Sequence, residues 1–92
     1  MTEVLSPDTI VRIAPTFRFQ WEPAQNAHVL LYPEGMVKLN ESASEILKRC
    51  NGSRTIGQII ADLKTEFPGT NLDADVMKFL HGALERGWIT RA

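Results

Sequence analysis

The sequence predicts an α+β fold of the winged-helix type, in which a three-stranded antiparallel sheet is followed by a three-helix bundle. Residues 17–39 contain three short apolar stretches separated by turn residues, which is the pattern of adjacent strands. From residue 40 onward, apolar residues recur every three or four positions, which is the pattern of helices. The chain has 92 residues, 43% of them hydrophobic and 23% charged, so it is long enough for one core and too short for two.

Residues 1–16 contain two prolines and no sustained apolar period, so we expect a mobile or loosely docked N-terminal arm ahead of a domain at residues 17–92. We do not expect the arm to be a signal peptide, because it carries two acidic residues where basic residues belong. Cys50 is the single cysteine and cannot form an internal disulfide. With no apolar run long enough to span a membrane, we expect a cytoplasmic protein.

Three strands are expected between the arm and the helices. Phe17, Phe19 and Trp21 alternate with polar residues, which predicts a first strand with one buried aromatic face. The near-continuous apolar run at residues 27–32 is typical of a central strand. The sequence PEG then predicts a turn, and residues 36–39 follow as a short third strand antiparallel to the second.

The first helix is expected to begin near residue 40. Its apolar stripe consists of Ala43, Ile46, Leu47 and Cys50, spaced i, i+3, i+4 and i+7. Asn40 and Ser42 are both candidate caps, and Ser42 with Glu45 matches a capping box. The pair Asn51 and Gly52 predicts that the helix closes in a left-handed turn.

Two more helices follow. Thr55 and Gln58 have the spacing of a capping box at the start of the second helix, which a Pro-Gly pair ends. Asp73 is the expected cap of the third helix, and Gly87 is its expected end. Residues 88–90 are predicted to be extended, as a candidate terminal strand.

Nothing in the sequence marks an active site. His28, His81 and Cys50 are the candidate metal ligands other than carboxylates, and no two of them have the spacing of a zinc motif. There is no nucleophile elbow and no glycine-rich phosphate loop. We therefore expect a binding protein that is not an enzyme and holds no cofactor or metal.

A DNA-binding winged-helix regulator is the alternative function that the fold class suggests. The third helix would be the recognition helix, and its charged residues are Asp73, Asp75, Glu85, Lys78 and Arg86. Three acids and two bases give this helix a net charge of −1, equal to the formal net charge of the whole chain. Because phosphate contacts require positive charge, the sequence counts against nucleic-acid binding.

Peptide binding is the function that the third strand favours. An exposed strand edge is normally charged, covered or used, and this strand contains one charged residue, Lys38, and no proline. The third helix has more apolar positions than one narrow stripe requires, so Phe79 and Met77 are expected at its flanks. Together these features predict an apolar groove between the third helix and the edge strand.

Three stretches resemble the pyrroloquinoline quinone biosynthesis protein D family, PqqD. They are LLYPEGMVKLNESASEIL, CNGSRTIGQIIADLKTEFP and DADVMKFLHGALERGWI, and the likeness covers about residues 15–92. Asn51 stands where the family pattern has aspartate, and either residue suits a turn. The resemblance implies a peptide chaperone, a recognition element of ribosomally made modified peptides. It would bind the precursor peptide PqqA and present it to the radical SAM enzyme PqqE, which holds the cofactors.

The resemblance also implies where the peptide binds. In this class of element, the leader peptide adds as a strand beside the third strand and over the third helix. The implied contacts are Met36, Val37, Lys38 and Leu39 on the strand, with Val76, Phe79, Leu80 and Ala83 on the helix. The same open edge, or an exchanged N-terminal arm, is also compatible with a homodimer, and the sequence leaves this open.

Overall fold

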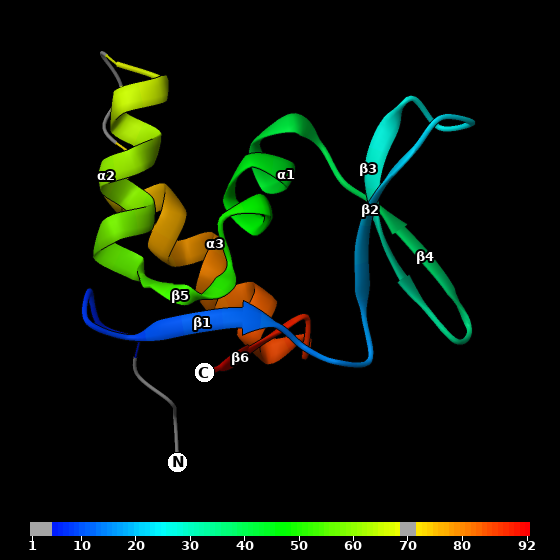
Figure 1. The fold of residues 1–92 in the computed structure, drawn as a ribbon, viewed down its shortest axis with the longest axis horizontal. Coiled ribbons are helices and arrows are strands. Elements are labelled where there is room, and N and C mark those ends of the chain that lie inside the picture. The colour runs from blue at the N-terminus through cyan, green and yellow to red at the C-terminus, as the bar shows by residue number, and fades with distance from the viewer. Residues whose placement is uncertain (1–4, 69–71) are drawn as a thin grey trace.

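The computed structural model describes residues 5–68 and 72–92 and contains three helices and two small antiparallel sheets (Figure 1). One sheet has the strand order β2-β3-β4 and is formed by consecutive strands. Its strands are β2 (Arg18–Glu22), β3 (Ala27–Tyr32) and β4 (Gly35–Lys38). The prediction of a three-stranded antiparallel sheet with three helices is therefore confirmed, and we call this unit the hairpin sheet.

The aromatic face of β2 is less buried than its alternation predicts. Phe17 and Phe19 are half-buried and pack against the core, but 49% of Trp21 is exposed. In the described structure, Trp21 packs edge-on against His28, with ring centroids 5.1 Å apart. The expectation of a uniformly buried face is wrong for Trp21, which lies near the end of the β2–β3 ladder and, unlike Phe17 and Phe19, does not pack against the core cluster.

A second sheet joins three segments that are distant in the sequence. Its order is β5-β1-β6, with β1 (Ile10–Ile13) between β5 (Asn51–Thr55) and β6 (Ile89–Arg91). Both pairings are antiparallel. The candidate terminal strand is therefore present as β6, whereas β1 and β5 lie in segments expected to be an arm and a turn.

The structure differs most from the expectation in the N-terminal segment. Val11 is fully buried at the centre of the second sheet, and Leu5 and Ala14 are also buried. A central strand is paired on both edges, which is the opposite of a mobile or loosely docked arm. The two prolines lie on either side of β1, where they do not interrupt its hydrogen bonds.

Helix α1 (Glu41–Lys48) is capped by Asn40 rather than by Ser42. The Asn40 side chain accepts a hydrogen bond from the Ala43 N–H at 2.7 Å. The predicted left-handed residue is present, since Gly52 has a φ of +83°. It lies within β5 rather than in a simple turn, and the β1–β5 register is irregular beside it. The expected turn is thus a bulged strand, because β1 supplies a pairing partner that local sequence does not reveal.

Helix α2 (Ile56–Glu66) begins with the predicted capping box. The Gln58 N–H donates to Thr55 Oγ1 at 3.1 Å, and the Thr55 N–H donates to Gln58 Oε1 at 2.8 Å. The N-terminal segment completes this cap, because the N–H groups of Ile56 and Gly57 donate to the carbonyls of Thr9 and Pro7, both at 2.9 Å. The first three N–H groups of the helix are thereby satisfied.

Within residues 5–68 and 72–92, no side chain caps helix α3 (Asp73–Glu85). The prediction that Asp73 is its cap is wrong: Asp73 lies in the first turn, and its carboxylate accepts a hydrogen bond from Lys64 at 2.7 Å. The predicted end is confirmed, since Gly87 has a φ of +76°. The N–H groups of Gly87 and Trp88 donate to the carbonyls of Leu84 and Ala83, which is a Schellman motif.

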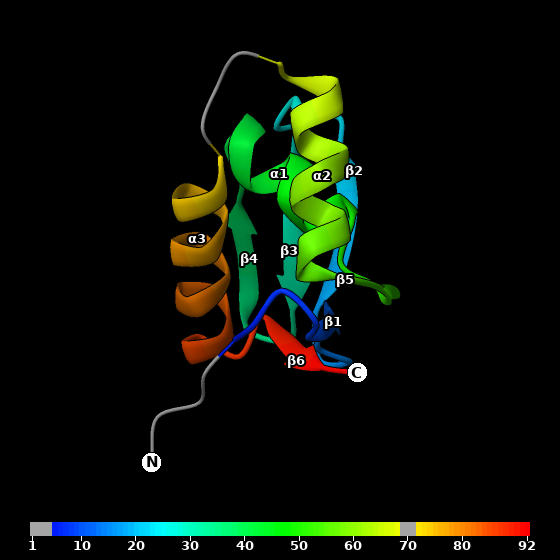
Figure 2. The same ribbon diagram turned by 90° about the vertical axis from the view of Figure 1, so that its left-hand side faces the viewer.

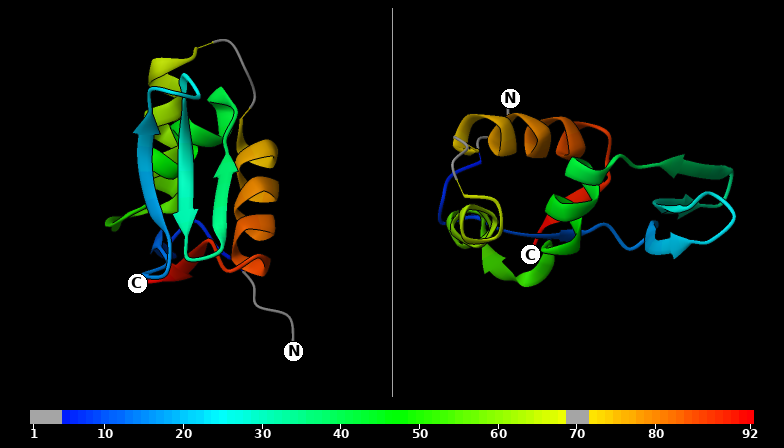
Figure 3. Two further views of the ribbon diagram at one scale, coloured as in Figure 1. Left: turned by 90° about the vertical axis from the view of Figure 1, so that its right-hand side faces the viewer. Right: turned by 90° about the horizontal axis from the view of Figure 1, so that it is seen from above.

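The hydrophobic core lies among the three helices and the second sheet, and the hairpin sheet attaches to it from one side. Leu30 and Leu39 belong to the core cluster, and α1 packs against β3. Seen from above, the hairpin sheet extends outward from the helices (Figure 3). The outer part of this sheet is therefore held mainly by its own ladder.

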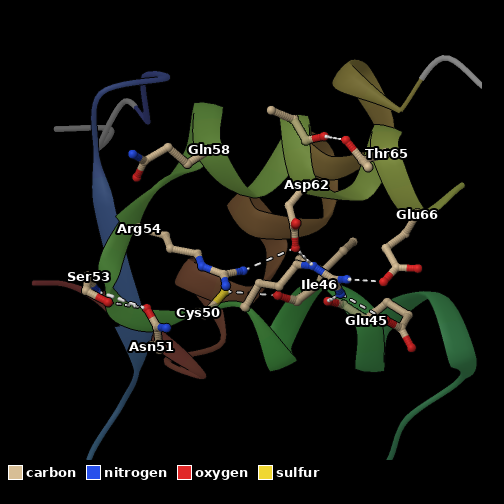
Figure 4. A network of polar contacts seen from close by, with 12 residues as sticks. Glu45, Ile46, Cys50, Asn51, Ser53, Arg54, Gln58, Asp62, Thr65 and Glu66 are labelled. Atoms are coloured by element: carbon tan, nitrogen blue, oxygen red, sulfur yellow. Dashed lines mark hydrogen bonds and ion pairs between the residues drawn. The ribbon is translucent and has the colours of Figure 1, made fainter. Parts of the chain in front are cut away.

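Arg49 joins α1 to α2 through a network of ion pairs (Figure 4). Its side chain is only 9% exposed; Nε donates to Asp62 at 2.5 Å, and a terminal nitrogen donates to Glu45 at 2.8 Å. Arg54 on β5 also binds Asp62, at 3.2 Å. The hydrogen bond from Arg49 holds the pKa of Asp62 below its ordinary value, and the same guanidinium lowers the pKa of Glu45.

Replacing Arg49 by Met is expected to destabilise the fold by about 1–3 kcal/mol, because hydrogen bonds to two carboxylates are lost. Both carboxyls have a lower pKa in the folded chain than in the unfolded chain. The network therefore stabilises the fold fully at pH values above the unfolded-state pKa, and this stabilisation is lost as the pH falls through the folded-state pKa. Urea midpoints at about pH 6 and about pH 3 measure this. Arg49→Met should lose less stability on acidification than the parent; an equal loss would contradict the role of the network.

Candidate functional site

The outer edge of β4 is the candidate site, because β4 lies at the end of the sheet order and pairs only with β3 among the described strands. The Leu39 N–H donates to the carbonyl of His28 at 3.0 Å, which makes these two residues a hydrogen-bonded pair. Such pairs alternate along an antiparallel ladder, so Val37 is also bonded to β3. The N–H and C=O groups of Met36 and Lys38 consequently point away from β3, toward an incoming strand.

The side chains of β4 alternate between the two faces of the sheet. Val37 and Leu39 face the helices: Leu39 is 5% exposed, and Val37 is half-buried against the core. Met36 and Lys38 lie on the opposite face and are exposed, Met36 to 43%. The side chains of an added strand would alternate in the same way. One set would lie on the helix-facing side of the sheet, and the other set would lie on the side of Met36 and Lys38.

The implied contacts on α3 differ from one another in accessibility. Val76, Leu80 and Ala83 are at most 2% exposed and belong to the core cluster. Phe79 is half-buried, packs against that cluster, and has its ring centroid 6.4 Å from that of Trp88. Phe79 is therefore the most accessible of these four positions.

The strand and helix positions are connected through the core cluster, against which residues of both elements pack. Figure 2 shows α3 and β4 on the same side of the molecule, and the view from above in Figure 3 shows the hairpin sheet standing out from α3. Val37 and Phe79 both pack against the shared cluster. Sequence reasoning did not single out Trp88, which flanks Phe79 and carries the Arg86 guanidinium 5.4 Å from its ring. Trp88 lies close to Phe79 because the chain turns at Gly87 in the Schellman motif.

The candidate metal ligands have separate roles. Cys50 is buried, its Sγ lies 3.4 Å from the Ile46 carbonyl, and burial raises its thiol pKa to about 12. His28 stacks on Phe19, with ring centroids 4.9 Å apart. Over residues 5–68 and 72–92, no three His, Cys, Asp or Glu side chains gather into a metal-binding group. In the same part of the chain, no helix has the length and hydropathy needed to cross a bilayer.

Comparison with known families and relatives agrees with this architecture. The family model described as coenzyme PQQ synthesis protein D (PqqD) matches residues 27–89. The PqqA binding protein of Stutzerimonas stutzeri strain A1501 is 58% identical over 74 residues, which is 79% of this chain and 80% of that protein. The PqqA binding protein of Methylococcus capsulatus is 42% identical over 85 residues, covering 92% of this chain and 91% of the relative.

A solved structure has the same fold. It is the solution NMR structure of the PqqD truncation of Methylobacterium extorquens PqqCD, described as a functional and stand-alone recognition element for ribosomally synthesised, modified peptides. The two chains superpose with a TM-score of 0.77 at 27% identity, and the match covers 96% of each.

Proposed function

The chain belongs to the PqqD family, and from that premise we propose that it is a peptide chaperone, not itself an enzyme, which binds the precursor peptide PqqA. The observation that carries the proposal is the open edge of β4, where Met36 and Lys38 direct their backbone groups outward. An extended peptide would add there as a fourth strand of the hairpin sheet. The names of the relatives indicate which peptide would bind, and the open edge of β4 supports binding by strand addition.

The energetics require side-chain contacts in addition to the ladder. Two outward residues offer four backbone groups, and each hydrogen bond contributes about 0.5–1.5 kcal/mol. A micromolar complex needs about 8 kcal/mol, and ordering a flexible peptide costs more. We therefore propose that the edge sets the orientation of the peptide, while apolar contacts supply most of the affinity. At about 25 cal/mol per Å², burial of about 300 Å² contributes roughly 7.5 kcal/mol before those costs.

We propose the peptide contacts that the family resemblance implies, and we propose that the peptide meets some of them before the others. They are Met36, Val37, Lys38, Leu39, Val76, Phe79, Leu80 and Ala83. The strand residues and Phe79 would be met first, because the other three helix residues are buried in the unbound chain. Contact with those three would require a rearrangement of the core cluster that buries them.

Presentation of the bound peptide to the radical SAM enzyme PqqE is part of the proposal. It rests on the family resemblance, in which the enzyme holds the iron–sulfur clusters and S-adenosylmethionine. The chain would contribute positioning alone: a peptide added to β4 stays on the surface, where a second protein can reach it.

An amide shift map tests the site. Titration of the chain with the candidate precursor peptide should move the signals of Met36, Lys38 and Phe79. The opposite edge of the same sheet is the internal control, because β2 also lies at the end of the strand order. Shifts confined to β2 would transfer the site to that edge, and no shifts at all would contradict the proposal.

Phe79→Ser is expected to weaken peptide binding more than Lys38→Ala does. Phe79 offers apolar area, whereas the Lys38 side chain is exposed and its backbone groups survive the alanine substitution. Leu80 is a poor probe, because it is fully buried and its replacement would act through folding. Isothermal titration of both variants, with melting curves to verify folding, decides the order; the reverse order would contradict the role of α3.

A homodimer through the same edge is a second proposal for β4, and it competes with the first. Two copies that pair their β4 edges would cover the groups of Met36 and Lys38 that the peptide uses. Sedimentation at increasing concentration detects such a dimer, and added peptide should dissociate it. A dimer that survives saturating peptide would have a different interface.

The winged-helix likeness also stays a proposal, supported by three helices packed beside a hairpin. DNA binding is not favoured, because the exposed charged residues of α3 are more acidic than basic.

A further inference from the structure

A cavity of about 370 Å³ lies where the first turn of α1, the end of α2 and the start of α3 meet. Its apolar lining consists of Ile46, Leu63, Phe67, Leu72 and Val76. This volume is within the range of sites that hold a ligand or a large side chain. No residue of β4 lines it, so the cavity is separate from the edge described above.

Phe67 extends the apolar lining onto the surface. It is 40% exposed, and it is one of the large hydrophobic residues that the described structure leaves open to solvent. Leu63 and Val76, by contrast, are at most 3% exposed and close the bottom of the cavity. A hollow with an aromatic residue at its edge is typical of a protein interface, where one anchor side chain enters and the neighbouring chain covers the rim.

The charged residues of the rim are all acidic. Glu41, Glu45 and Asp75 line the cavity, and no Lys or Arg of the described part of the chain lines it. Glu45 is already paired with Arg49 at 2.8 Å, whereas within the described residues no ion pair is formed by Glu41 or Asp75. The nearby lysine of α2, Lys64, is itself paired with Asp73. The rim thus has negative charge available for a partner.

We propose that this cavity binds a segment of a second protein in which a large apolar side chain is flanked by Lys or Arg. The apolar side chain would enter the cavity beside Phe67, and the basic residues would lie against Glu41 and Asp75. A small ligand inside the cavity would leave the exposed part of Phe67 uncovered, which favours a polypeptide. The inference does not depend on strand addition at β4. Val76, at the bottom of the cavity, is the one residue that both sets of proposed contacts include.

Two matched synthetic peptides test this site on the full chain. Both contain Leu-Phe at the centre, flanked by two Arg residues in one peptide and by two Glu residues in the other. The basic peptide should bind at least about tenfold more tightly in fluorescence anisotropy and should shift the amide signals of Ile46, Leu63 and Val76. Equal affinities, or no binding of the basic peptide, would overturn the proposal.

Variants locate the effect. The double variant Glu41→Gln, Asp75→Asn should reduce the preference for the basic peptide at least about fivefold, because the rim charge is lost. Glu34→Gln is the matched control, since Glu34 is an exposed carboxylate in the β3–β4 turn, outside the cavity. Phe67→Ser should weaken the basic peptide as well. Shifts on β4 in place of the cavity would overturn this inference and leave the proposal for β4 standing.

Discussion

A chain that lacks residues 1–13 is expected to lose cooperative folding. The deletion removes β1, the central strand of the second sheet, and leaves β5 and β6 without a shared partner. It also removes the buried residues Leu5 and Val11 and the two carbonyls that cap α2. A small domain has roughly 5–15 kcal/mol of net stability, and losses from strand, core and cap together are of that order. Thermal melting followed by far-ultraviolet circular dichroism measures the result.

Two point variants separate this effect from simple shortening. Val11→Asp should unfold the chain, because it places a carboxylate at a position that is 0% exposed and has no partner there. Arg12→Ser, on the same strand, should change stability by no more than about 0.5 kcal/mol, because Arg12 is exposed. A deleted chain that melts cooperatively and binds the peptide would instead show that residues 17–92 form a domain without the arm.

Lys38→Pro is expected to reduce peptide binding by at least about tenfold while the chain stays folded. Proline removes the outward N–H of residue 38 and places its ring where the added strand would lie. The fold should tolerate the change, because this N–H does not bond to β3 and edge strands accept proline at such positions. Titration calorimetry with the precursor peptide measures the loss.

Lys38→Ala is the control for the side chain, because it removes the ammonium group and keeps the backbone N–H. Its affinity should stay within about fivefold of the parent, since an exposed charge contributes at most about 1 kcal/mol. If Lys38→Ala and Lys38→Pro weaken binding equally, the lysine charge holds the peptide and strand addition at β4 is ruled out. If neither variant weakens binding, the peptide lies elsewhere.

The hairpin sheet could be read from the sequence because its determinants are local. Alternating residues, a turn and a change of periodicity lie within a few positions of the elements that they specify. The predicted strand at 36–39 is observed at Gly35–Lys38, and the predicted capping box at Thr55 and Gln58 is present. The edge of β4 follows from the same information, since a short strand that turns directly into a helix has no later neighbour in its sheet.

The second sheet could not be read in this way. Ile10–Ile13 is too short for its alternation to be recognised, and its partners lie about 40 and 80 positions further along the chain. Asn51 and Gly52 have the composition of a helix end, and only pairing with β1 makes their segment a strand. Strand pairing between distant segments therefore makes part of a sheet out of both the segment expected to be an arm and the segment expected to be a turn.

The sequence by itself determined the family, the hairpin sheet, the three helices and the open edge, because these depend on patterns within short stretches. Tertiary structure alone decided which apolar residues of α3 are accessible. Val76, Leu80, Ala83 and Phe79 have similar hydrophobicity and spacing, but the first three face the core and Phe79 lies at its margin. Helical periodicity establishes that a face is apolar, whereas the elements packed against that face determine how much of it remains open to a ligand.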